Sequence, residues 1–145
     1  PVTVMASATL AFGKGANLGK GAVTVEMNAT MEVLSGINKF DGGLTLNDGA
    51  TLSFNFTERT VAPLIAIAEG KTLTVNGAVK VKIPADSKWP TGGKKILTTC
   101  GGFNAEGVTV SLAEGAPKWA KGIDVNEEGN IVLTVRPKPT MIIVR

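Results

Sequence analysis

The sequence has no histidine and no tyrosine, and it has only one cysteine among its 145 residues. The absence of imidazole excludes Ser-His-Asp triads, Cys-His dyads and histidine-ligated metal sites. Cys100 cannot form a disulfide within the chain, and it follows the apolar residues Ile96 and Leu97. We therefore expect a buried, unreactive thiol. These absences argue against an enzyme, and no catalytic, cofactor or metal site is predicted.

Clustered positive charge and long hydrophobic runs are also scarce. Fifteen basic and twelve acidic residues give a net charge of +3, and aromatic residues make up 5% of the chain. A nucleic-acid interface needs a basic stripe with interleaved aromatic residues, and no such stripe exists here. No segment approaches the roughly 18 apolar residues that span a membrane. The sequence therefore predicts neither a nucleic-acid partner nor a transmembrane segment.

The remaining sequence motifs do not match a phosphate-binding, glycosidase or calcium-binding site. The glycine-rich segment 13–21 has the wrong spacing for a phosphate-binding loop and is not followed by a helical pattern. The carboxylates are spread along the chain, so no pair suited to glycoside hydrolysis is evident. Asp41 and Asp48 flank glycine-containing turns, but no calcium-binding repeat surrounds them.

What the sequence does have is an internal repeat of short alternating segments rich in valine and threonine. Three such triplets follow one another at equal intervals: Val2-Thr3-Val4, Val23-Thr24-Val25 and Leu44-Thr45-Leu46. Each is followed by a second alternating segment that begins with Ala-Thr: Ala8-Thr9, Ala29-Thr30 and Ala50-Thr51. A fourth copy, residues 73–81, follows the third after a longer interval. Alternation with period two predicts strands throughout.

A fixed period of about 21 residues with matched apolar positions predicts a β-solenoid, in which each unit stacks on the next and no unit buries its inward face alone. We assign these units to residues 1–84. The pattern changes after Pro84, and residues 122–125 and 131–135 flank a loop typical of a hairpin. Residues 85–136 are predicted to form an antiparallel β cap. Residues 137–145, with Pro137 and Pro139, are predicted to be an exit linker or the start of a following segment.

Several of these segments resemble the passenger-associated repeats of bacterial autotransporter-like β-helix proteins. The resemblance covers residues 8–135 and rests on the following segments: Gly42–Phe54, Thr74–Gly77, Gly92–Thr98, the pair Gly101 and Gly102, Trp119, and Leu133–Val135. It implies an all-β, right-handed parallel β-helix that is exported to the cell surface or secreted. It also implies a role in adhesion, display or a stalk. Because both ends look cut, we expect a fragment of a longer protein.

The expected function is thus a non-catalytic structural or adhesive segment of a bacterial cell-surface or secreted protein. Its expected partners are a host or bacterial surface glycan or protein, with end-to-end self-association as a further expectation. One alternative is a carbohydrate-binding or polysaccharide-processing module of an extracellular protein, with Trp89 and Trp119 as ligand-surface aromatics. A second is a β-sandwich, which would place Val2, Val23 and Leu44 on different sheets, whereas a solenoid stacks them.

Overall fold

The computed structural model describes residues 2–13, 17–34, 37–56, 65–88, 93–99, 103–104, 109–127 and 129–136. This part of the chain is all β: it contains sixteen strands and no helix, as the sequence predicted. The strands are β1 (Val2–Val4), β2 (Thr9–Phe12), β3 (Val23–Val25), β4 (Thr30–Val33), β5 (Asn38–Phe40), β6 (Leu44–Leu46), β7 (Thr51–Phe54), β8 (Ile65–Ile67), β9 (Leu73–Val75), β10 (Ala78–Lys82), β11 (Gly93–Ile96), β12 (Thr98–Thr99), β13 (Phe103–Asn104), β14 (Thr109–Leu112), β15 (Ala120–Val125) and β16 (Ile131–Val135).

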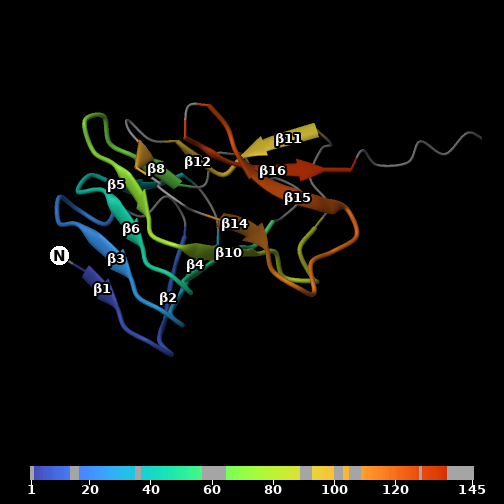
Figure 1. Cartoon of the computed structure of the whole chain (residues 1–145), viewed down its shortest axis with the longest axis horizontal. Coiled ribbons are helices and arrows are strands. Elements are labelled where there is room, and N and C mark those ends of the chain that lie inside the picture. Colours follow the sequence, from blue (N-terminus) through green and yellow to red (C-terminus); the bar gives the residue numbers. More distant parts are fainter. Residues whose placement is uncertain are drawn as a thin grey trace, which may run out of the picture.

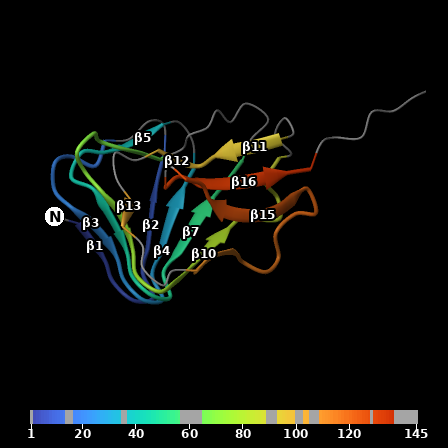
Figure 2. The same cartoon turned by 45° about the horizontal axis from the view of Figure 1, so that its top comes forward.

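Three of the four sheets are parallel, and the chain visits them in turn. Sheet A has the order β1-β3-β6-β9-β13, sheet B the order β14-β10-β7-β4-β2, and sheet C the order β12-β8-β5. Sheets A and B meet at a sharp corner, where each unit of the chain turns from one sheet into the next (Figure 2). Successive units therefore lie side by side, each paired with the unit before it and the unit after it.

The strand register follows the sequence repeat. Val2 pairs with Val23 and Val23 pairs with Leu44, so the first three units are offset by the repeat period in sheet A. The same offset joins Thr9, Thr30 and Thr51 in sheet B. Leu44 pairs with Leu73, which confirms the longer offset of the fourth unit. Val2, Val23 and Leu44, which a β-sandwich would place on different sheets, therefore share sheet A.

Alternation within each strand places the apolar residues in one continuous core. In sheet A, the rows that begin with Val23 and Val25 face inward and are fully buried, while the threonine between them is only half-buried. In sheet B, Met31, Leu52 and Val81 form one inward row, with none of their side-chain surface exposed. Because like residues lie directly above one another, each apolar side chain packs against its counterparts in adjacent strands.

Glycine is required where two units approach closely. A Cβ at Gly42 would lie 2.3 Å from the carbonyl carbon of Gly21, which is its counterpart one unit earlier. Backbone therefore packs on backbone at this corner, and any side chain at Gly42 would force the two units apart.

The second half of the chain combines parallel and antiparallel pairing. The hairpin predicted around residues 126–130 is confirmed by the antiparallel pairs of β15 and β16, and β11 completes sheet D on the other side of β16. Sheet D lies far from β1, on the side opposite the N-terminus (Figure 1). It is joined to sheet C by the Ile131 N–H, which donates to Thr98 Oγ1 at 2.9 Å.

The predicted antiparallel cap, residues 85–136, also contains strands that pair in parallel. Strands β12, β13 and β14 extend sheets C, A and B in parallel, as the pairs Thr98–Ile65, Phe103–Leu73 and Val110–Val79 show. These strands are short and their spacing departs from the repeat period, so the sequence repeat did not reveal them. The predicted linker, residues 137–145, lies outside the described residues. Within the described part, no helix has the length and apolar character needed to cross a membrane.

Candidate functional site

The outer face of sheet B carries a row of polar side chains that crosses all five strands. The register aligns, from one edge to the other, Thr9, Thr30, Thr51, Lys80 and Ser111. These residues face away from the core because their neighbours in each strand point inward. The outward row thus supplies hydroxyl groups with a single ammonium group between Thr51 and Ser111.

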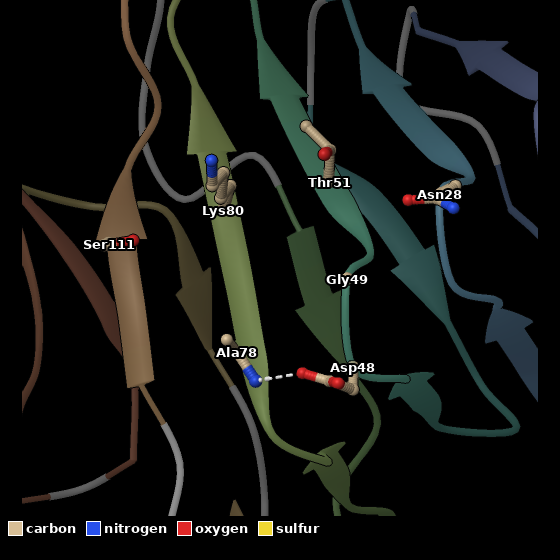
Figure 3. Close-up of a pocket in the computed structure, with 7 residues that line it drawn as sticks. All are labelled: Asn28, Asp48, Gly49, Thr51, Ala78, Lys80 and Ser111. Carbon is tan, nitrogen blue, oxygen red and sulfur yellow. Dashed lines mark hydrogen bonds between the residues drawn. The ribbon is translucent and has the colours of Figure 1, made fainter.

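Part of this row borders a hollow of about 440 Å³ on the sheet surface. Its lining comes from three neighbouring strands, β7, β10 and β14, and from the turns before β4 and β7: Asn28, Asp48, Gly49, Thr51, Ala78, Lys80 and Ser111. Figure 3 shows Lys80 and Thr51 toward one end of the hollow and Asp48 beside Ala78 at the other. Among the described residues, no aromatic or large aliphatic side chain contributes to this lining, and its polar groups are two hydroxyls, one amide and one charge of each sign.

Asp48 is held in place by the next unit of the chain. Its Oδ1 atom accepts a hydrogen bond of 2.7 Å from the Ala78 backbone N–H. The carboxylate lies over Gly77, where a Cβ would come within 2.5 Å of Oδ1. Gly77 also has a φ of 77°, in the left-handed region that favours glycine. The absence of a side chain at Gly77 therefore makes room for the Asp48 carboxylate.

Backbone hydrogen bonds between units fix the floor at this end of the hollow. The Asn28 N–H donates to the Gly49 carbonyl at 3.1 Å, and the Gly49 N–H donates to the Ala78 carbonyl at 2.7 Å. Three successive turns are thereby tied to one another. The backbone at this end of the hollow is consequently ordered before any ligand arrives, which lowers the entropy cost of binding there.

The hollow has one charge of each sign at separate positions. Among the described residues, the structure shows no ion pair for Lys80 and no hydrogen bond to Asp48 Oδ2. The described part of the chain also contains no group of three or more acidic or cysteine side chains close enough to hold a metal ion. The arrangement can bind an anionic group at Lys80 and hydrogen-bond donors at Asp48.

A second polar row lies at the corner that follows sheet A. Asn47 Nδ2 donates to Glu26 Oε2 at 3.0 Å, and Asn76 Nδ2 donates to Asn47 Oδ1 at 3.0 Å. This ladder links three units through their side chains. Because these hydrogen bonds join one unit to the next, the ladder stabilises the turns.

The aromatic residues singled out from the sequence lie elsewhere. The Trp119 side chain is 6% exposed, and its ring meets Phe56 edge to face, with centroids 5.8 Å apart. A sugar stacks on an exposed aromatic face, and Trp119 offers little of one. Trp89, the other candidate, and Cys100 lie outside the described residues.

Sequence reasoning did not bring the hollow's residues together. The longer offset of the fourth unit was available as a signal, because it aligns Lys80 with Thr51. Ser111 had no such signal, since the spacing that pairs it with Lys80 occurs nowhere in the sequence repeat.

We compared the sequence with protein-family models and with curated proteins, and the structure with solved structures; none of these comparisons gave a match.

Proposed function

We propose that this chain is a structural or adhesive segment of a bacterial cell-surface or secreted protein, built as a right-handed parallel β-helix. Each coil of this β-helix contributes one strand to sheet A and one to sheet B, and the later coils add one to sheet C. The segment is not an enzyme. Its mechanical role is to hold a stiff surface, and its adhesive role is to present the outer face of sheet B to a surface glycan or protein.

The observation that carries this proposal is the unbroken parallel register from β1 to β9 and from β2 to β10. Stacked apolar rows make each coil depend on its neighbours for burial, which produces a stiff, quasi-one-dimensional unit. The polar outer rows, with scattered carboxylates, suit contact with a partner better than catalysis. The resemblance to autotransporter-like repeats agrees with this role.

The β-helix can be tested by lengthening the chain. Inserting two further copies of residues 23–43 after residue 43 should give a folded protein that unfolds in one cooperative transition. The maximum dimension measured by small-angle X-ray scattering should increase by about 10 Å, which is two strand spacings. The control is an insertion of the same composition in scrambled order, which should prevent folding. Loss of folding with the ordered insertion as well would contradict a solenoid.

The adhesive role can be tested with the protein attached to beads. Beads that carry the folded chain should adhere to mammalian or bacterial cells more than beads that carry an unfolded variant, Leu52→Asp. Treatment of the cells with glycosidases or proteases then distinguishes a glycan from a protein partner. Equal adhesion of the two bead types would leave only the structural role.

The second candidate function is a carbohydrate-binding module of an extracellular protein. It is supported by the hollow on sheet B, whose hydroxyl, amide and charged groups match the hydrogen-bonding groups of a sugar. Binding to a glycan array without adhesion to cells would favour this function.

A further inference from the structure

The groups lining the hollow on sheet B are complementary to one particular class of ligand. Lys80 supplies a cation, and the hydroxyl groups of Thr51 and Ser111 lie beside it in the adjacent strands. Together they can hold an anionic group through one charged and two neutral hydrogen bonds. The second oxygen of Asp48 can accept hydrogen bonds from hydroxyl groups at the other end.

The backbone positions of the two ends are separated by about the width of a sugar ring, and the exposed Lys80 side chain extends from one of them. Asp48 is bonded to the backbone of Ala78, and Lys80 lies two residues further along the same strand. Two residues of a parallel strand span about 6.6 Å. Consider a ligand with a six-membered ring that carries an anionic group on one side and hydroxyl groups on the opposite side. When its anionic group lies at Lys80, its hydroxyl groups lie at Asp48.

The carboxylate of Asp48 also selects against other anions. A phosphate group brings close to two negative charges toward Asp48, and its one or two hydroxyl groups offset that repulsion only in part. A neutral sugar leaves the Lys80 ammonium without a counter-charge. A carboxylate-bearing sugar satisfies both ends, because its acid group meets the cation and its hydroxyl groups meet the acceptors.

We propose that the hollow lined by Asp48, Thr51, Lys80 and Ser111 binds one acidic sugar unit, a carboxylate-bearing pyranose of a surface glycan. The proposal rests on the adhesive role given above and names its ligand. A single shallow site of this kind binds weakly, so strong attachment comes from many copies on one surface. The contacts are exposed, and the affinity for one sugar unit is therefore of millimolar order.

The direct test is a titration of the isotopically labelled protein, followed by the NMR amide signals of Thr51, Ala78, Lys80 and Ser111. The probes are sodium D-glucuronate, D-glucose, sodium acetate and inorganic phosphate. Glucuronate should shift these signals with a dissociation constant roughly threefold to tenfold lower than that of any other probe. Equal affinity for glucose or for acetate would overturn the proposal, as would no shift of these signals with glucuronate.

A pair of matched variants locates the cation. Lys80→Gln should weaken glucuronate binding by roughly threefold to tenfold, because it removes one charged hydrogen bond at an exposed site. Lys82→Gln is the control, since Lys82 is exposed on the same strand but does not line the hollow. Equal effects of the two substitutions would mean that general positive charge, not this site, attracts the sugar.

The thermal unfolding of both variants should match that of the parent chain. If glucuronate does not bind while beads carrying the protein still adhere to cells, the acidic-sugar site is wrong and the proposed function stands. If adhesion is absent while glucuronate binds, the adhesive role is wrong and the second candidate function, a carbohydrate-binding module, takes its place.

Discussion

At the scale of single residues, two glycines show how closely the units approach one another. Gly42 lies against the backbone of Gly21, and Gly77 lies beneath the carboxylate of Asp48. The two positions differ in what a side chain would meet: backbone at Gly42, and a side chain that can rotate at Gly77. A side chain at Gly42 should be tolerated less well than one at Gly77, because neither unit at Gly42 can move without disturbing its strand pairing.

Gly42→Ala should lower the free energy of unfolding by about 2–3 kcal/mol, the upper part of the range found for overpacked sites. The measurement is urea denaturation followed by circular dichroism. Gly122→Ala is the matched control, because a Cβ at Gly122 would have no neighbour within 4 Å, and it should change stability by less than about 0.5 kcal/mol. Equal stability of the two variants would contradict the close approach at Gly42.

Gly77→Ala tests the position of Asp48. The added methyl group would displace the carboxylate and break its hydrogen bond with the Ala78 N–H. We expect a loss of about 1–2 kcal/mol in stability from the strained φ and the lost hydrogen bond. The double variant Asp48→Ala with Gly77→Ala relieves only the collision, so it should be less destabilised than the sum of the two single variants. Additive losses would place Asp48 elsewhere.

At the scale of elements, each strand has an inward and an outward face that tolerate different residues. Leu52 in β7 has no exposed surface, while Thr30 in the neighbouring strand β4 is only half-buried and faces outward. The inward face excludes charge because a buried ion without a partner loses its hydration. The outward face keeps contact with water.

Leu52→Asp should cost more than about 4 kcal/mol, enough to unfold a domain of ordinary stability. Thr30→Asp, the outward control, should cost less than about 1 kcal/mol, which is the span of strand propensities. Thermal melting of the two purified variants checks this difference. A folded Leu52→Asp variant would show that the inward register is wrong.

At the scale of the whole molecule, the two ends of the parallel sheets differ. Within the described residues, β1 and β2 are edge strands with no further neighbour, whereas β14 packs against β15 of sheet D. The open edge leaves apolar surface uncovered: Val2 is 38% exposed, while its counterpart Val23 is fully buried. Unpaired edges of this kind are templates for pairing with another chain.

We therefore expect concentration-dependent self-association through β1 and β2, measured by analytical ultracentrifugation. Thr3→Lys together with Thr9→Lys should reduce it, because lysine on an edge strand opposes strand pairing. Thr24→Lys together with Thr30→Lys is the control: it adds the same charge to the same outward rows, one strand further in. If the control reduces association equally, net charge and not the edge is responsible.

The sequence by itself determined the all-β class, the register of the repeated units and the hairpin around residues 126–130. These features depend on period, alternation and turn residues, which are local and repeat along the chain. The positions of Val2, Val23 and Leu44 in one sheet followed from spacing alone. The absence of histidine likewise set limits on chemistry without any structure.

Only the tertiary structure decided where the irregular parts of the chain pair. Strands β12, β13 and β14 join the parallel sheets at spacings that no longer repeat, so their partners are set by long-range packing. The burial of Trp119 against Phe56 and the placement of Ser111 beside Lys80 depend on those pairings. The hollow on sheet B therefore had only a partial signature in the sequence: the offset of the fourth unit aligns Lys80 with Thr51, whereas Ser111 joins them through a pairing outside the repeat.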